Sequence, residues 1–117
     1  MPDVPKRWDS LFVGWFASYK RPWLFGARTP ASGGARKLAV GKADVDEESL
    51  RLAAQLAQEG VEVRSEVPYA SLAELYNSAL EVHVPTTVEG GGERAVLEAR
   101  ACGAPLFGPY IAALQPR

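Results

Sequence analysis

Apolar and polar positions along the chain fall into short blocks that predict strands and helices in turn. Apolar, strand-forming residues predict strands at residues 11–16 (LFVGWF) and 37–41 (KLAVG). Residues 61–67 begin with a period of two and predict a strand near a sheet edge. Two further extended segments, residues 80–85 and 104–107, predict strands in the second half of the chain.

Helix signals fill the segments between these strands. Pro22, at the head of PWLFGAR, suits the first turn of a helix. Residues 46–59 place their apolar side chains on one helical face, with Asp46 or Glu47 at the positive end and Gly60 at the stop. Both ends of this helix are therefore marked in the sequence.

Two more helices are predicted after the third strand. Ser71 and Glu74 have the spacing of a capping box and predict that a helix opens there. Residues 93–102 follow a triple-glycine loop and predict a helix that Gly103 stops. Strands that alternate with helices at this spacing predict an α/β fold, a doubly wound Rossmann-like parallel sheet of about five strands with helices on both faces. The order of the strands cannot be read from the sequence.

Composition and charge fit one globular domain. The chain has 117 residues, of which we expect residues 1–10 to be an N-terminal extension and residues 11–117 to form the domain. Hydrophobic residues make up 47% and charged residues 23%, so a core is feasible. A formal net charge of −1 gives no bulk field that would recruit nucleic acid or an anionic membrane. Cys102 is the only cysteine, which excludes an internal disulfide and a Cys-based zinc site.

The sequence lacks the signals that are typical of several protein classes. No run of about 18 apolar residues predicts a transmembrane helix, and residues 1–10 lack the pattern of a signal peptide, so we expect a cytoplasmic protein. There is no G-x-G-x-x-G after a strand, no P-loop and no G-x-S-x-G elbow, which removes the main support for dehydrogenases, P-loop proteins and hydrolases. Asp44 and Asp46 stand at a helix start, where capping is favoured, so we expect no metal.

The remaining candidates for chemistry have a packing explanation. His83, the only histidine, lies in an apolar predicted strand, where a hydrogen-bonded core or strand-end histidine is favoured over a catalytic base. Trp8, Trp15 and Trp23 cluster near the first strand, and core or interface packing is expected for them. Cys102 is expected in the core as well.

Two loops could hold an anion, because open α/β sheets bind ligands at the carboxyl ends of their strands. After the first strand, Gly14 lets the backbone approach a ligand, and Lys20 and Arg21 can meet a phosphate; solvated basic residues are the alternative. After the fourth strand, residues 88–94 place three glycines where N–H groups can converge on an anion at a helix start. The alternative for this loop is a loose turn whose glutamates complement the helix dipole.

The order of these motifs resembles the C-terminal, donor-binding domain of GT-B glycosyltransferases, of the retaining family 4 type. The resemblance runs from residue 11 to residue 107. Residues 12–22 (FVG and KRP) resemble the family's "VGR…K" segment, and residues 72–85 resemble its "L…Y..ad.fv.PS" stretch. Residues 89–103 (EGGGERAVLEARACG) resemble the specific "EGFG…LEAMACG" signature.

This resemblance implies transfer of a sugar from a nucleotide-sugar donor, such as a UDP- or GDP-sugar, held in this domain without a further cofactor. Lys20 matches the basic residue that stabilises the diphosphate leaving group, and Glu98 matches the glutamate that contacts the ribose. Gly91 and Gly92 match backbone positions that face the sugar and diphosphate, and Gly14 matches the glycine of the first segment. A departing nucleoside diphosphate builds up negative charge, which a lysine and a helix N-terminus are suited to stabilise.

The chain departs from the family pattern at three points. Trp15 stands where the family has an arginine, which removes a cation from the phosphate site. The first glutamate of the Glu-x7-Glu motif is displaced by one position to Glu89, or its role passes to Glu93, so Glu89 is the catalytic candidate and Glu93 a donor-binding one. We also expect that the N-terminal acceptor domain and the closing C-terminal helices of the family are absent, which would leave half of a site that lies between two domains in GT-B enzymes.

Two functions remain open. The first is a donor-binding domain of a hexosyltransferase that needs a second domain or subunit, with no transfer expected from the chain alone. The second is a non-catalytic remnant of the fold that acts as an interaction or structural module. Lys20, the glycine loop and Glu98 favour the first, although Glu98 can also form an i,i+4 ion pair with Arg94. Both functions predict an exposed apolar surface and hence a homodimer or a partner chain.

Overall fold

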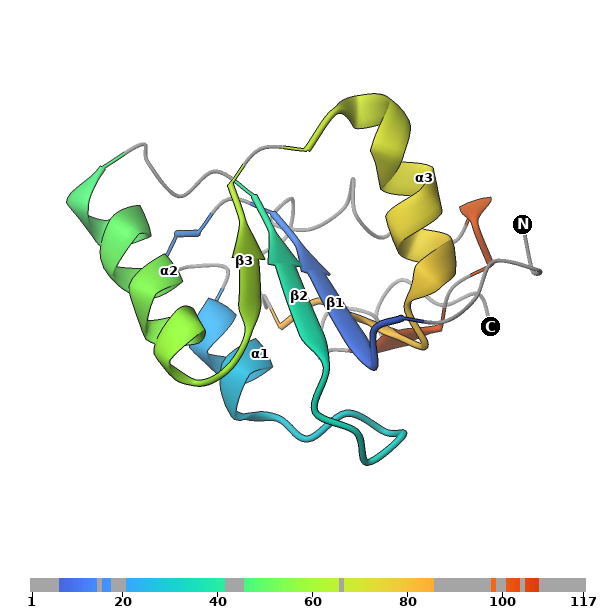
Figure 1. Cartoon of the computed structure of the whole chain (residues 1–117), viewed down its shortest axis with the longest axis horizontal. Coiled ribbons are helices and arrows are strands. Elements are labelled where there is room, and N and C mark those ends of the chain that lie inside the picture. The colour runs from blue at the N-terminus through green and yellow to red at the C-terminus, as the bar shows by residue number, and fades with distance from the viewer. Residues whose placement is uncertain are drawn as a thin grey trace, which may run out of the picture.

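The computed structural model describes residues 7–14, 16–17, 21–41, 46–65, 67–85, 98, 101–103 and 105–107 (Figure 1). In these ranges a parallel sheet lies between helices on two sides, which confirms the α/β class and the parallel sheet expected from the sequence. No helix in the described part of the chain is both long and apolar enough to cross a membrane.

The sheet runs in the order β3-β2-β1-β4-β5, and each neighbouring pair of strands is parallel. Each strand is shorter than the segment that the sequence predicts: β1 is Ser10–Val13, β2 Lys37–Val40, β3 Glu62–Arg64, β4 Val82–His83 and β5 Leu106–Phe107. β3 lies at one edge, as predicted. β1 lies in the middle of the sheet, between β2 and β4, which the sequence does not reveal.

Helices α1 and α2 lie on one side of the sheet (Figure 1). α1 covers Pro22–Ala27, with the predicted proline in its first turn. α2 covers Glu47–Gln58 and is capped by Asp46, whose carboxylate accepts from the Ser49 N–H at 2.8 Å while its own N–H donates to the Ser49 hydroxyl at 3.1 Å. Gly60 follows the end of α2 with a φ of 89°, the left-handed conformation that stops a helix. Both predicted ends of α2 are confirmed.

Helix α3 covers Tyr69–Ser78 and lies on the other side of the sheet (Figure 1). The prediction that Ser71 and Glu74 open this helix with a capping box is wrong. The helix begins directly after Pro68, without a side-chain cap, and the Ser71 N–H donates to the Pro68 carbonyl at 2.8 Å. Pro68 stands at the N-cap position with a φ of −54°, which its ring fixes, and the first turn begins at Tyr69, before Ser71.

Side chains of the central strands alternate between two apolar clusters, one on each face of the sheet. Leu11 and Leu38 pack on the α3 side, against Tyr76. Phe12, one position after Leu11, packs on the opposite side with Phe25 of α1 and with the apolar face of α2. A parallel sheet covered on both faces therefore explains why the strand segments are apolar almost throughout.

The tryptophans and the cysteine differ in burial. Trp8 is partly buried against the α3-side cluster, and the guanidinium of Arg64 lies 5.6 Å from its ring centroid. Cys102 is partly buried against the same cluster. Trp23, for which packing was expected, is instead exposed on α1, and Trp15 lies outside the described residues.

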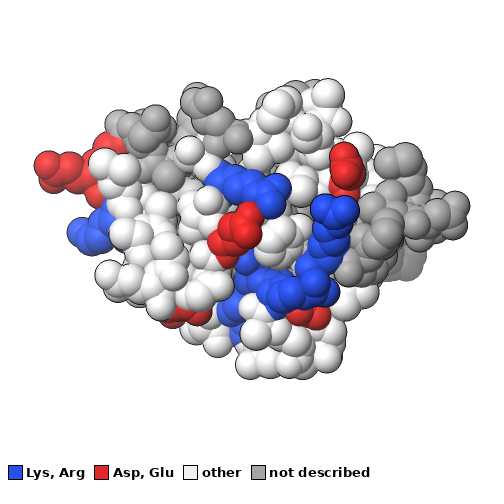
Figure 2. Space-filling model, viewed as in Figure 1, with Lys and Arg blue, Asp and Glu red and all other residues white. Residues whose placement is uncertain are grey.

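Charges of both signs are mixed on the face shown in Figure 2, where Lys and Arg side chains gather across the middle with Asp and Glu side chains among them. Arg64 pairs with Glu62 at 2.7 Å, and Arg36 lies 3.8 Å from Asp9. Neighbouring opposite charges cancel at a distance, which agrees with the net charge near zero.

Candidate functional site

The strand order creates a topological switch point between β1 and β4. The chain leaves β1 through α1 toward β2 on one side, and it reaches β4 on the other side of β1 through α3. Open α/β sheets bind ligands outside the carboxyl ends of the strands at such a point. Gly14 directly follows β1, and Pro85 comes two positions after β4. These two residues define the candidate site.

Gly14, a predicted donor-binding residue, lies at this switch point with its backbone held by the sheet. Its N–H donates to the Val40 carbonyl at the end of β2, at 2.9 Å. Phe16 and Ala17, which come shortly after, are buried, and the Phe16 ring stacks on Phe12 with centroids 5.9 Å apart. The path of the chain out of β1 is therefore set by packing, which is the support that a binding loop needs.

Arg21 joins the two halves of the switch point. Its Nε and Nη2 donate to the Pro85 carbonyl at 2.9 and 2.7 Å, across 64 residues of sequence. Its φ and ψ are both 51°, and it is the one non-glycine residue with positive φ in the described ranges. The left-handed conformation costs an L-residue roughly 1–2 kcal/mol. Two hydrogen bonds from a charged donor offset this cost and hold Arg21 next to Pro85.

The sequence does not anticipate the contact between Arg21 and Pro85. A residue that precedes proline favours an extended conformation, so Arg21, ahead of Pro22, is expected to be extended rather than left-handed. Only the order of the strands brings Pro85 next to the loop after β1. The one useful sequence signal is the position of Arg21 beside Lys20 in a loop that follows a strand.

Glu98, the predicted ribose contact, touches α3. The Tyr76 hydroxyl donates to Glu98 Oε1 at 3.4 Å, a long hydrogen bond from a residue that is almost fully buried. The Cys102 N–H donates to the Glu98 carbonyl at 3.2 Å, and Gly103 has a φ of 73°, as expected for the last turn of a helix and its glycine stop. The alternative partner, Arg94, lies outside the described residues.

The other predicted site residues lie outside the described part of the chain, as does most of the glycine loop and of the helix predicted after it: Lys20, Glu89, Gly91, Gly92 and Glu93. The structure therefore describes Gly14 and Glu98 from the predicted set. Within the same ranges, no three His, Cys, Asp or Glu side chains are grouped so that they could hold a metal ion.

Comparison with known proteins adds one decisive observation. No protein-family model and no curated protein sequence matches the chain. The crystal structure of AviGT4, a glycosyltransferase involved in avilamycin A biosynthesis, matches 91% of the chain with a TM-score of 0.70 and 26% sequence identity. The chain has a glycosyltransferase-like Rossmann fold. It spans 34% of the AviGT4 chain.

Within this glycosyltransferase-like fold, His83 is buried in β4, which confirms its predicted place in the core. Its ring centroid lies 6.1 Å from that of Phe25, and its Nδ1 has no hydrogen-bond partner in the described structure. Among the described residues, the expected hydrogen bond is therefore missing at Nδ1, and the ring lies beside that of Phe25. Burial lowers the pKa of His83 to about 4, and the positive charge of Arg28 is the second largest cause of this shift. The imidazole is neutral at pH 7.

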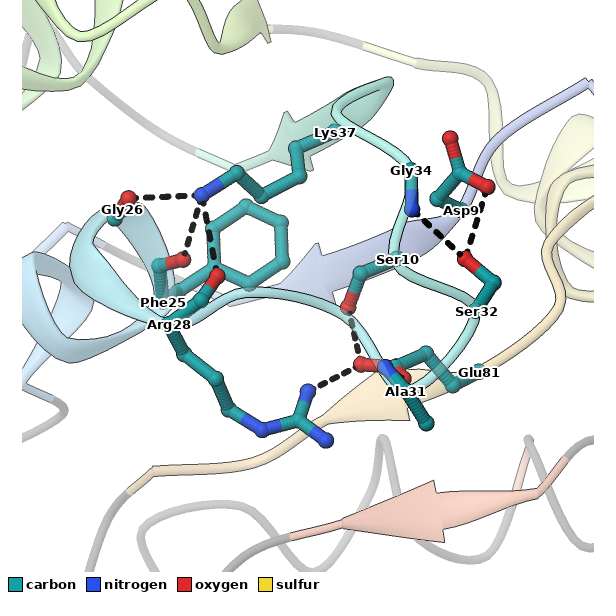
Figure 3. A network of polar contacts seen from close by, with 10 residues as sticks. All are labelled: Asp9, Ser10, Phe25, Gly26, Arg28, Ala31, Ser32, Gly34, Lys37 and Glu81. Atoms are coloured by element: carbon teal, nitrogen blue, oxygen red, sulfur yellow. Dashed lines mark hydrogen bonds and ion pairs between the residues drawn. The ribbon is translucent and has the colours of Figure 1, made fainter.

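A buried carboxylate ties β1 and β4 together at the opposite, amino edge of the sheet (Figure 3). Glu81 is 2% exposed and accepts hydrogen bonds from the Ser10 hydroxyl at 2.7 Å, the Ala31 N–H at 2.8 Å and the Arg28 guanidinium. Burial alone would raise the pKa of the Glu81 carboxyl, but these hydrogen bonds outweigh it and lower the pKa. The ionised carboxylate accepts its hydrogen bonds from groups of the fold itself, so this cluster has a structural role.

Lys37 completes the C-terminal end of α1. Its Nζ donates to the carbonyls of Phe25, Gly26 and Arg28 at 3.2, 2.6 and 3.2 Å (Figure 3). These carbonyls lack partners within the helix, and they lie at the negative end of its dipole. Burial lowers the pKa of Lys37. The lysine therefore serves the helix and not a ligand.

Asp9 organises the loop between α1 and β2. Its carboxylate accepts from the Ser32 hydroxyl at 2.8 Å and from the Arg36 N–H at 3.0 Å. The Arg36 N–H and the Ser32 hydroxyl lower the pKa of Asp9. A Cβ added at Gly34 would lie 2.3 Å from this carboxylate, so a larger residue there would have to displace the Asp9 side chain. No sequence pattern indicates these contacts, because their partners are brought together by the turn of the loop.

Proposed function

We propose that this chain is the nucleotide-sugar-binding half of a retaining glycosyltransferase of the GT-B, family 4 type. The observation that carries the proposal is the agreement of nearly the whole chain with a glycosyltransferase structure, AviGT4, combined with a switch point formed by β1 and β4. A switch point of this kind is where open α/β sheets bind nucleotides. Two of the segments that resemble the donor-binding motifs lie at these strands: residues 12–22 run out of β1, and residues 89–103 come after β4.

The proposed donor contacts come from the loop after β1 and from the loop and helix after β4. Lys20 binds the diphosphate and stabilises the charge that develops as the nucleoside diphosphate leaves. Glu98 binds the ribose hydroxyls, and Glu89 acts near the sugar. The remaining contacts in our assignment come from Gly14, Gly91, Gly92 and Glu93.

Sugar transfer requires a second unit that binds the acceptor. The chain spans about a third of the AviGT4 chain, and a donor site on one sheet edge contacts only one side of the reaction centre. We therefore propose that a further domain, a second copy or a partner chain completes the site. The donor base, the sugar and the acceptor are left to experiment.

Calorimetric titration of the purified chain with UDP, GDP, ADP and their sugar conjugates, without added metal, tests donor binding. We expect saturable binding of one nucleotide, weakened in Lys20→Ala and in Glu98→Gln. Arg36→Ala is the matched control, because Arg36 is an exposed basic residue at the amino edge of the sheet, away from the switch point. Absence of binding at millimolar concentrations of every nucleotide would reject the proposal and favour an interaction module.

The Glu98 variant needs a second readout because of the Tyr76 contact. A glutamine keeps an acceptor for the Tyr76 hydroxyl but loses the negative charge that favours ribose hydroxyls. We expect Glu98→Gln to lower nucleotide affinity while the melting temperature changes little. A lower melting temperature with unchanged affinity would assign Glu98 to the fold alone.

A further inference from the structure

Arg21 is a half-buried cation at the switch point, and its described partner is a backbone carbonyl oxygen. Arg28 pairs with Glu81, and the guanidinium groups of two other arginines lie within 4 Å of carboxylates. Arg21 instead has the carbonyl oxygen of Pro85 as its partner, and no acidic side chain of the described residues forms an ion pair with it. Within the described ranges, the half-buried guanidinium at the switch point therefore has no acidic partner.

The hydrogen bonds of Arg21 also leave one edge of the guanidinium available. Nε and Nη2, which form its side edge, both donate to the single Pro85 oxygen. Of the five N–H donors of an arginine, the two on Nη1 and the second on Nη2 remain, and no described residue accepts from them. Nη1 and Nη2 form the end edge of the guanidinium, the geometry that binds two phosphate oxygens at once.

The backbone of Arg21 fixes where this edge lies. Its left-handed conformation is strained for a residue with a side chain, and such strain persists where the surrounding structure holds a functional group in place. Pro85 provides that hold from the other side of the switch point. The cation is thus attached both to the loop after β1 and to the segment after β4.

We propose that Arg21 binds the diphosphate of the nucleotide donor, with the end edge of its guanidinium on phosphate oxygens while its side edge stays on the Pro85 carbonyl. This inference rests on the proposed function, since it names a further residue of the same donor site.

Nucleotide binding by Arg21→Gly and Arg21→Asn tests the proposal. Both residues adopt the left-handed conformation readily, so neither variant should unfold the chain. Titrations use UDP, GDP and ADP, and in parallel the nucleosides uridine, guanosine and adenosine, which lack phosphate. We expect both variants to bind the preferred diphosphate about 10-fold to 100-fold more weakly, with unchanged affinity for the nucleoside. Arg36→Gly serves as the control for loss of an arginine.

Each result separates the possible roles of Arg21. Unchanged diphosphate affinity in both variants would overturn this inference and leave the proposed function intact. Equal losses for diphosphate and nucleoside would also overturn it, because they would show that Arg21 acts by holding Pro85. If the unmodified chain binds none of the three diphosphates, the proposed function fails and this inference fails with it.

Discussion

The Ser10 hydroxyl donates to the Glu81 carboxylate at 2.7 Å, and this contact joins the first residue of β1 to the residue that precedes β4, 71 positions later. β1 and β4 are short neighbours, paired in register through Leu11 and Val82. Few backbone hydrogen bonds join these two strands. The buried Glu81 carboxylate therefore strengthens their pairing at the amino ends.

Glu81→Gln should destabilise the fold substantially. The amide cannot accept from Ser10, Ala31 and Arg28 together as the carboxylate does, and it removes the negative charge that pairs with the Arg28 guanidinium. We expect a loss of roughly 3 kcal/mol in the free energy of unfolding, measured by urea denaturation. Glu62→Gln removes an exposed ion pair and should cost less than about 1 kcal/mol. Equal effects of the two substitutions would contradict this account.

Asp46→Ala should weaken α2 by about 1 kcal/mol, because it removes the side-chain acceptor for the Ser49 N–H. Gln55→Ala, an exposed change in the same helix, should leave stability within about 0.5 kcal/mol. Thermal melting followed by circular dichroism measures both. A stable Asp46→Ala variant would mean that packing of the apolar face alone determines the start of α2.

Lys37→Met should destabilise the end of α1. The methionine preserves the apolar stem but leaves three carbonyls without their donor, for which we expect a loss of roughly 1–3 kcal/mol. Arg36→Met is the neighbouring control, because the Arg36 side chain is mostly exposed and its ion pair is long. Hydrogen exchange of the α1 amides should rise in the first variant and not in the second.

Stability should fall as the pH drops from about 6.5 toward 4, because of His83. The folded pKa of about 4 lies below the usual 6.5, so in this window the unfolded chain binds a proton that the folded chain does not. The loss can reach roughly 3 kcal/mol. His83 is the only histidine, and the lowered pKa values of Glu81 and Asp9 add a further loss as the pH falls below about 5.

His83→Leu isolates this effect. The leucine removes the buried Nδ1 that has no hydrogen-bond partner, so we expect stability at pH 7 to be equal or higher. Urea denaturation between pH 7 and pH 5 should show a sloping profile for the native chain and a flat one for the variant. Parallel profiles would show that His83 is not the group that titrates.

Local sequence signals predicted which helices and strands form better than they predicted where each one begins and ends. Asp46 and Gly60 mark the ends of α2 correctly, because capping and left-handed stops act over a few residues. The first strand was predicted too long because Phe16 is apolar and buried yet lies beyond the strand pairing. The start of α3 was misplaced because Pro68 opens the helix before the capping pattern at Ser71 can act.

The sequence by itself determined the α/β alternation, the caps of α2 and the edge position of β3, since each depends on periodicity or on neighbours within a few residues. Only the tertiary structure decided the strand order, the bond from Arg21 to Pro85 and the burial of Glu81. Parallel strands are paired by the packing of helices on both faces of the sheet, so residues distant in the chain meet in ways that no local pattern encodes.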